Sequence, residues 1–321
     1  MKRTAFEESN EPHWVDLEST LAALDSKQPA MDARRLPRLF RQVCGDLALA
    51  QQRMYGRKLC ERLNTMVIGA YQHLHLALNR GASGFVRFFA ATFPQGVRRE
   101  AALVWLNFAL FFAPLAAFLA AAYFEPKWIF ALLPPELRQM MDAQYGAGTG
   151  DEYVREQFGS NFGMFGFYIM NNVSINFRIF AGGVILGVGA AYGIGYQGVF
   201  IGAMFGYVHH SGNPERLYTF CSSHSSWELL GFILGGAAGM RIGLALVNPG
   251  RLTRMAALRD AGRRALPVLL GSTAMISCAA VIEGFFSPSS APAGLKYTVG
   301  ILGWVMFAAY FSLAGRRMDA T

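Results

Sequence analysis

The stretch HSSWELLGFILGGAAGMRIGLALVNPG, residues 224–250, decides the fold class of this chain. It is mostly apolar and exceeds the roughly 20 residues that a transmembrane helix needs. It opens with a His and a Glu, carries one Arg, and has a glycine at every fourth position from Gly231 to Gly243. Catalysis, transport and helix packing are therefore all candidate roles for this segment.

The composition places most of the chain in a membrane. Only 16% of the 321 residues are charged, whereas soluble domains average about 25%. The first hundred residues differ, because they contain 15 Lys/Arg and 10 Asp/Glu, and they predict a helical cytoplasmic or interfacial region. The four cysteines are scattered and predict neither a disulfide framework nor a metal site. The N-terminus lacks the apolar segment of a signal peptide, so we expect insertion through an internal span.

Apolar segments predict an all-α, polytopic membrane protein with a helical region at 1–98 and a transmembrane bundle at 99–321. About six spans are expected, with an outer loop at 125–174. The break GIGYQG at 193–198 separates the second span from the third. A re-entrant hairpin is the alternative there, and we favour two spans. The predicted spans are 101–124, 175–195, 198–211, 226–247, 266–286 and 295–314.

Arginines orient these spans, because cytoplasmic loops carry an excess of Lys and Arg. Arg98 and Arg99 precede the first span, residues 249–265 contain five Arg and one Asp, and Arg316 and Arg317 follow the last span. All three groups face the cytoplasm if both termini are cytoplasmic. The predicted outer loop then has three basic and six acidic residues.

Ionisable residues from distant segments are predicted at one depth, near the outer leaflet. They are Arg178, His224, Glu228 and Glu283, with Asn172 beside them. Such groups cost at least about 2.5–3.5 kcal/mol each at mid-membrane and normally face partners or water. They either mark helix ends, or form a cluster that is a structural ion pair, a proton relay or a binding cavity. Among the cluster interpretations we favour a pairing that orients helices.

Small residues predict close helix packing, since backbones in lipid approach one another best through glycine. Glycines recur at every fourth position in two of the predicted spans, and these glycine rows also favour a homo-oligomer, with a dimer preferred. Arg241, near the inner end of its span, is expected to extend to the cytoplasmic interface. The packing residues are Gly198, Gly202, Gly206, Gly231, Gly235, Gly239 and Gly243.

No catalytic motif is recognisable in the sequence. No GK[ST] follows a glycine cluster, HSSWE does not match HExxH, and no nucleophile elbow is present. The basic segments lack stacked aromatic residues, so they predict contact with anionic lipid rather than nucleic acid. We therefore expect no catalytic residue, no metal and no cofactor. A scaffold ranks first, a channel or transporter second, and an intramembrane enzyme third.

Five segments carry a resemblance to a known family. They are residues 165–203, 224–254 and 281–300, with FEESNEPHWVDLESTL and DLALAQQR near the N-terminus. Together they resemble the stage II sporulation protein M family, in the longer branch found in non-sporulating bacteria. The resemblance implies a multi-pass protein of the bacterial inner membrane that acts as a scaffold in an envelope complex. It also implies partnership with a MoxR-type AAA+ ATPase or an RDD-family membrane protein, and it carries no catalytic residues over.

Overall fold

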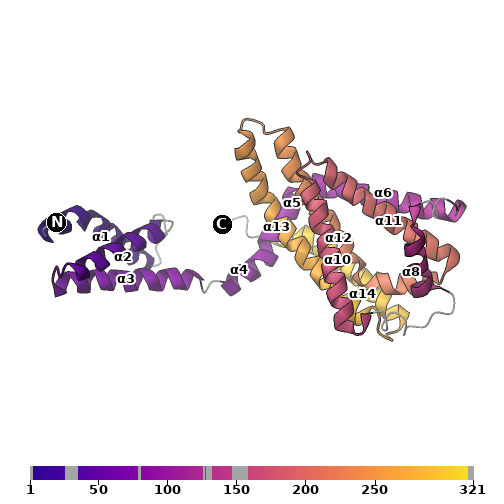
Figure 1. The fold of residues 1–321 in the computed structure, drawn as a ribbon, viewed down its shortest axis with the longest axis horizontal. Helices are drawn as coiled ribbons and strands as arrows, with labels where there is room; N and C mark the ends of the chain where they lie inside the picture. Colours follow the sequence, from indigo (N-terminus) through magenta and orange to yellow (C-terminus); the bar gives the residue numbers. More distant parts are fainter. Residues whose placement is uncertain are drawn as a thin grey trace. The chain divides into compact units, whose positions relative to one another are not determined.

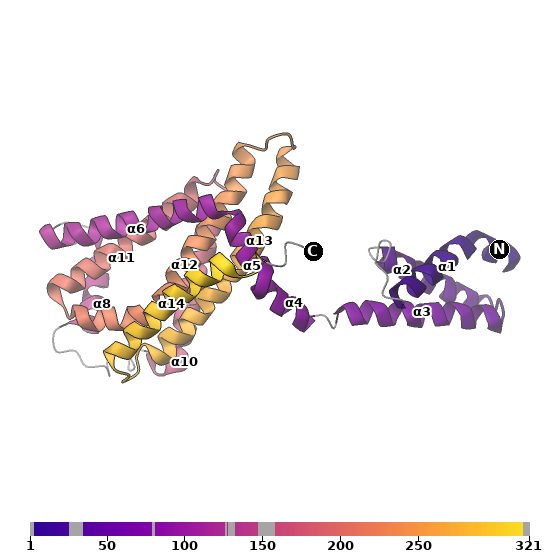
Figure 2. The same cartoon turned by 180° about the vertical axis from the view of Figure 1, so that it is seen from behind.

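The computed structural model describes residues 3–25, 35–78, 81–125, 127, 132–146 and 158–316. Their regular structure is helical, and no strand occurs among them. Five helices are long and apolar enough to cross a bilayer, so the predicted class is confirmed. The chain divides into two compact units, Met1–Val86 and Arg87–Thr321, whose helices are labelled in Figures 1 and 2. Arg317 and residues 147–157 of the predicted outer loop lie outside the described residues.

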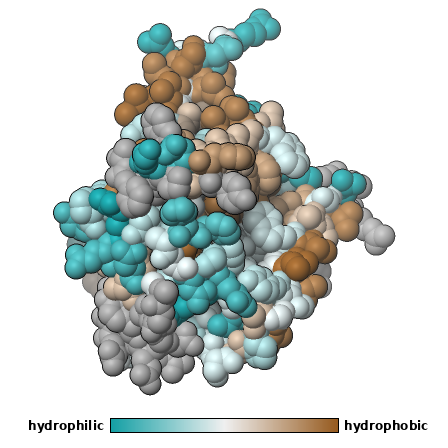
Figure 3. Space-filling model, turned by 90° about the vertical axis from the view of Figure 1, so that its right-hand side faces the viewer, coloured by the Kyte–Doolittle hydropathy of each residue, from teal (hydrophilic) through white to brown (hydrophobic). Residues whose placement is uncertain are grey.

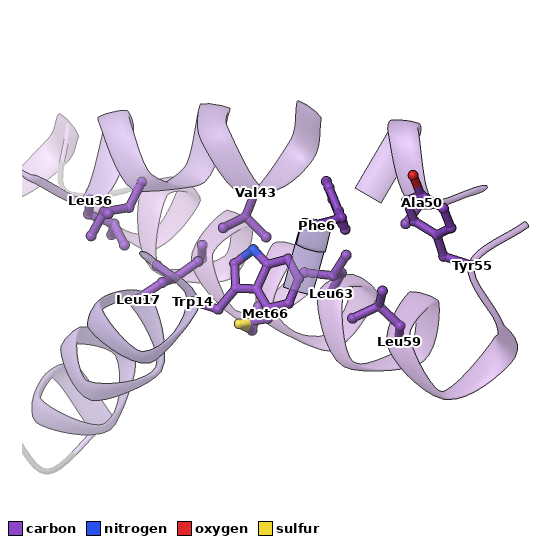
Figure 4. Close-up of a cluster of buried hydrophobic side chains, with 12 residues drawn as sticks. Phe6, Trp14, Leu17, Leu36, Val43, Ala50, Tyr55, Leu59, Leu63 and Met66 are labelled. Carbon is purple, nitrogen blue, oxygen red and sulfur yellow. The ribbon is translucent and has the colours of Figure 1, made fainter. Parts of the chain in front are cut away.

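The N-terminal unit contains three helices, α1 (Arg3–Asp25), α2 (Leu36–Gln52) and α3 (Arg57–Leu78). Each helix contributes apolar residues to one common core. Figure 4 shows the fully buried Trp14 ring among the side chains of Val43, Leu63 and Met66. Burial of such large side chains is the main stabilising contribution in a unit of this size.

Polar contacts around Trp14 join the three helices. Its Nε1 donates to Oδ2 of Asp46 over 2.9 Å. The Arg62 guanidinium lies 5.7 Å from the Trp14 ring centroid and pairs with Glu11 at 2.8 Å and Glu18 at 2.9 Å. The hydrogen bond to Glu18 is the main reason that the pKa of Arg62 is raised above its usual value. The unit is thus held by its own core and its own polar contacts.

The second unit is a helical bundle with α12 at its centre. Helix α12 packs against α6, α10, α11, α13 and α14. Helix α4 (Gly81–Arg87) crosses the unit boundary. The helices of the bundle are η2 (Phe88–Thr92), α5 (Phe93–Arg99), α6 (Ala101–Phe124), α8 (Pro135–Tyr145), α10 (Asn161–Gly182), α11 (Val188–Ser211), α12 (Pro214–Val247), α13 (Arg254–Val281), η3 (Ile282–Phe286) and α14 (Ala293–Leu313).

The two ends of the bundle differ in their surface chemistry. We call the end formed by the α10–α11 and α12–α13 turns the arginine end, because Arg251 and Arg254 are exposed there. The other end, formed by α8 and the α11–α12 turn, is called the α8 end, and it exposes Glu136, His209 and Glu215. In Figure 3 the α8 end is largely pale or hydrophilic, whereas the projecting α12–α13 hairpin is apolar below a hydrophilic tip.

Several predicted spans agree with the helices. The span 101–124 coincides with α6, and 295–314 agrees closely with α14. The spans 226–247 and 266–286 are the apolar parts of longer helices, since α12 begins at Pro214 and α13 at Arg254. Hydropathy located these helices but not their polar first turns.

The predicted bounds 175–195 and 198–211 are wrong. Helices α10 and α11 are separated by a turn at residues 183–187, where Leu186 has φ 51° and Gly187 has φ 84°. Helix α10 therefore begins within the segment predicted as an outer loop, and α11 is a single uninterrupted helix. Helix α10 is not among the five helices that qualify as spans by length and hydropathy.

The glycines of GIGYQG do not break α11. They permit close packing against neighbouring helices instead. Gly193 lies against Ile179 of α10, and Gly198 lies against the carbonyl oxygen of Phe111 in α6. A helix in an apolar environment keeps its internal hydrogen bonds, because no water competes for them. Glycine content alone is therefore a poor signal for a helix break in this bundle.

The unit boundary falls after Val86, earlier than the boundary that we predicted at residue 98. The reason is that the segment before α6 contributes to the bundle core. Phe93 is buried against Gly271 of α13, and its ring centroid lies 5.5 Å from that of Phe311 in α14.

The glycine row of α12 packs against other helices of the same chain. Gly231 faces α13, Gly235 and Gly239 face α10, and Gly243 faces the α10–α11 turn. A β-carbon at Gly239 would lie 2.6 Å from the carbonyl oxygen of Phe180. These contacts leave no room for side chains, so the row lets α12 approach its neighbours closely.

The glycine row of α11 is used in the same way. Gly198 and Gly202 lie against the carbonyl oxygens of Phe111 and Leu115 in α6, and Gly206 is buried. These rows are therefore occupied within the chain and offer no free surface to a second copy.

Arg241 forms an ion pair rather than extending alone to the interface. Its Nε donates to Oε2 of Glu100 over 2.7 Å, and its Nη2 contacts the same oxygen. The side chain of Glu100 is 2% exposed and that of Arg241 is 29% exposed. The pair connects α12 to the start of α6.

Candidate functional site: a buried His–Glu–Glu cluster

Helix α12 provides two ionisable side chains of the candidate site. His224 and Glu228 are one turn apart and share a helix face. Nε2 of His224 lies 3.6 Å from Oε2 of Glu228, and their side chains are 4% and 15% exposed. Asn213 caps α12 by accepting a hydrogen bond from the backbone N–H of Arg216. Because α12 begins there, both residues lie in its interior rather than at its start, where we predicted them.

The π-helical segment η3 provides the third ionisable side chain. Oε1 of Glu283 lies 3.5 Å from Nε2 of His224. The N–H of Ser287 donates to the carbonyl oxygen of Ile282 over 2.8 Å, which is the hydrogen-bond spacing of a π-helix, a form often found at functional sites. The Oγ of Ser287 lies 3.0 Å from Nδ1 of His224 and 2.8 Å from Oγ of Ser223. Glu283 and Ser287 therefore both face His224.

Helix α10 contributes asparagine side chains that hydrogen-bond to the cluster. Nδ2 of Asn172 donates to Oε2 of Glu283 over 3.0 Å, and Nδ2 of Asn171 donates to Oδ1 of Asn172 over 2.9 Å. Arg178 is exposed further along α10, and its Nε donates to the carbonyl oxygen of Ser174 over 3.3 Å. The structure thus brings together Asn172 and the three ionisable groups, and places Arg178 apart from them.

A cavity of about 790 Å³ lies beside the cluster. Helices α10 and α11 touch near their shared turn, where Gly182 meets Gly189, and they diverge toward the α8 end (Figure 1). The cavity occupies this wedge, with α12 behind it and α8 at its end. Its volume falls within the range of about 300–1,000 Å³ for small-molecule pockets. His224, Glu228, Glu283, Asn172 and Arg178 line it together with many aromatic side chains, among them Tyr168, Tyr192, Tyr196, Phe200 and Phe220.

The cluster can stabilise a positive charge. Two carboxyl groups face the same imidazole nitrogen in an apolar interior, where an uncompensated charge is costly. A proton on His224 or a bound cation would provide that compensation. Asn172 donates to one carboxylate and Ser287 contacts the far side of the imidazole, so both groups are held in place.

Sequence reasoning missed Ser287 and the Glu100 partner of Arg241. The sequence did not indicate a role for Ser287, because nothing in FFSPSS predicts the π-helical turn that directs this residue toward His224. Glu100 could have been noticed as the one acidic residue directly before the uncharged span 101–124.

Two family models match the chain. The model described as stage II sporulation protein M matches residues 101–288. A model described as a domain of unknown function matches residues 4–76. The first covers α6 to η3 and the second covers most of the three-helix unit. No curated protein and no solved structure matches the chain.

Proposed function

The chain belongs to the stage II sporulation protein M family, and from this premise we propose that it serves as a non-enzymatic membrane scaffold or assembly factor for an envelope-associated complex. The observation that carries the proposal is the separate N-terminal unit, Met1–Val86, which has its own core and precedes the helical membrane bundle in the sequence. A compact charged unit attached to a membrane anchor is suited to hold a partner at the membrane surface.

The proposed partner is a MoxR-type AAA+ ATPase or an RDD-family membrane protein, on the basis of the resemblance to the longer branch of the family. The proposed location is the bacterial inner membrane with both termini cytoplasmic. The arginines of the arginine end support this orientation, since positive charge is enriched on the cytoplasmic side. A homodimer also belongs to the proposal, and it would use lipid-facing side chains because the glycine rows are occupied within the chain.

Crosslinking followed by affinity purification from native membranes tests the scaffold. We expect a defined partner with the full chain and its loss when residues 1–86 are deleted. The matched control is Gly45→Ala in α2, where an added β-carbon meets nothing within 4 Å, and this variant should retain the partner. Equal recovery with and without the N-terminal unit contradicts the proposal, as does the absence of any enriched protein.

A channel or transporter is the second candidate, and the cavity beside the buried cluster favours it. Ionisable residues within membrane bundles commonly lie on ion or substrate pathways. Flux into proteoliposomes should then depend on Glu283, so Glu283→Gln should abolish it. Glu215→Gln, at an exposed position in the first turn of α12, should leave it unchanged. No flux for a panel of ions and solutes, or full flux in Glu283→Gln, would exclude this function.

A further inference from the structure

The ligand atoms of the buried cluster have the spacing of a metal site. Nε2 of His224 is 3.5 Å from Oε1 of Glu283 and 3.6 Å from Oε2 of Glu228, and one atom from each residue lies within 4.8 Å of the others. Tetrahedral Zn²⁺ with bonds of about 2.0–2.1 Å to nitrogen and oxygen requires ligand atoms about 3.3–3.4 Å apart. The two distances from His224 are only slightly wider, and the carboxyl oxygens lie within 4.8 Å of each other, so side-chain movements would close the site around an ion.

The surrounding hydrogen bonds are those that hold metal ligands. A ligating His usually bonds through its other ring nitrogen to a polar group, and ligating carboxylates are themselves hydrogen-bonded. Here Nδ1 of His224 lies 3.0 Å from Oγ of Ser287, and Asn172 donates to Oε2 of Glu283 over 3.0 Å. In the tautomer in which Nδ1–H donates to Ser287, the lone pair of Nε2 faces the side where both carboxylates lie.

The charges also favour a cation. The side chains of His224 and Glu283 are each 4% exposed, so two ionised carboxylates beside one neutral imidazole would leave an excess negative charge in a buried site. A divalent ion would balance both carboxylates while His224 stays neutral.

We infer that His224, Glu228 and Glu283 bind one divalent transition-metal ion. One imidazole and two carboxylates suit Zn²⁺ or Mn²⁺, and a fourth position would face the cavity, which all three residues line. This site goes beyond the scaffold proposal, because metal binding can be measured without any partner. Sequence motifs could not reveal it, since Glu283 is far from His224 along the chain.

The full-length protein, purified in detergent, stripped with a chelator and reloaded with Zn²⁺ or Mn²⁺, provides the test. Elemental analysis after desalting should give about one ion per chain for the wild type. His224→Ala and Glu283→Gln should lose the ion, and Asn172→Ala should weaken its binding by about 10–100-fold as a supporting residue. Co²⁺ in the wild type should give the visible absorption of a four-coordinate site.

Two controls separate this site from other causes of metal loss. His209→Ala removes an exposed histidine at the α8 end and should retain the ion, which excludes adventitious surface binding. Glu228→Gln changes one oxygen to nitrogen at the edge of the cluster, where the side chain is 15% exposed, and its monodispersity by gel filtration establishes that it is folded. A folded Glu228→Gln that binds like the wild type overturns the assignment. A wild-type chain that binds no stoichiometric Zn²⁺ or Mn²⁺ overturns it too, and indicates a cluster compensated by protons alone.

Discussion

Substitution of single glycines should change the stability of the bundle in opposite directions according to their surroundings. In Gly239→Ala the new β-carbon would meet the Phe180 backbone, 2.6 Å from its carbonyl oxygen and 2.9 Å from its Cα. Backbone atoms cannot rotate away, so α10 and α12 must separate. In Gly262→Ala, within α13, the new β-carbon meets nothing within 4 Å.

The expected magnitudes follow from these contacts. Overpacking of a close contact costs about 1–3 kcal/mol, and the higher helix propensity of alanine offsets up to about 1 kcal/mol of that. Gly239→Ala should therefore lower the free energy of unfolding by about 1–2 kcal/mol. Gly262→Ala should raise it by about 0.5–1 kcal/mol, because alanine loses less backbone entropy on folding.

Thermal unfolding of the full chain in detergent micelles measures the difference. For domains of about 150–250 residues, 1 kcal/mol shifts Tm by roughly 2–4 °C. The midpoint should fall for Gly239→Ala and rise for Gly262→Ala, under identical detergent and lipid. If Gly239→Ala is as stable as Gly262→Ala, the close approach of α10 to α12 at Gly239 is incorrect.

Three further changes test other parts of the structure. Arg241→Ala leaves Glu100 buried without its partner and should lower the free energy of unfolding by about 3–5 kcal/mol, which a lower Tm would show. The double variant with Glu100→Leu should recover much of this stability, and a double variant as unstable as Arg241→Ala would argue against the ion pair. Trp14→Ala should lower the stability of the N-terminal unit by about 3–5 kcal/mol. Hydrogen exchange should then show lost protection in α1–α3 and unchanged protection in α12, and loss of protection in both units would contradict their independent packing. Gly187→Ala should lower Tm through a strain of about 1–2 kcal/mol, since alanine disfavours φ 84°; an unchanged Tm would rule out the left-handed turn.

The membrane class could be predicted because hydropathy is a local property. The uncharged segment 101–124 became α6 with the same bounds, and the apolar part of α12 was located correctly. The α10–α11 turn could not be predicted, because GGVILG at 182–187 is as apolar as a helix interior. Its break depends on backbone conformations at Leu186 and Gly187 that the apolar pattern conceals.

The candidate site was predictable only in part. His224 and Glu228 share a helix face by spacing alone, whereas the approach of Glu283 depends on the π-turn of η3 and on the packing of α13 against α12. The sequence predicted Arg178 at the same depth as the cluster, but the observed bounds of α10 place this residue close to the arginine end. An error in the position of one helix break therefore moved one candidate residue away from the rest.

The weak hydropathy of α10 has a consequence for biogenesis. Helix α10 carries Asn172, Asn176 and Arg178. The side-chain amides of its two buried asparagines donate to Glu283 of η3 and to Ser272 of α13. Both partners are synthesised later, and polar side chains without partners are costly in lipid. Stable insertion of α10 should thus await the arrival of α12 and α13, so this bundle is completed from its C-terminal half backwards rather than helix by helix in order of synthesis.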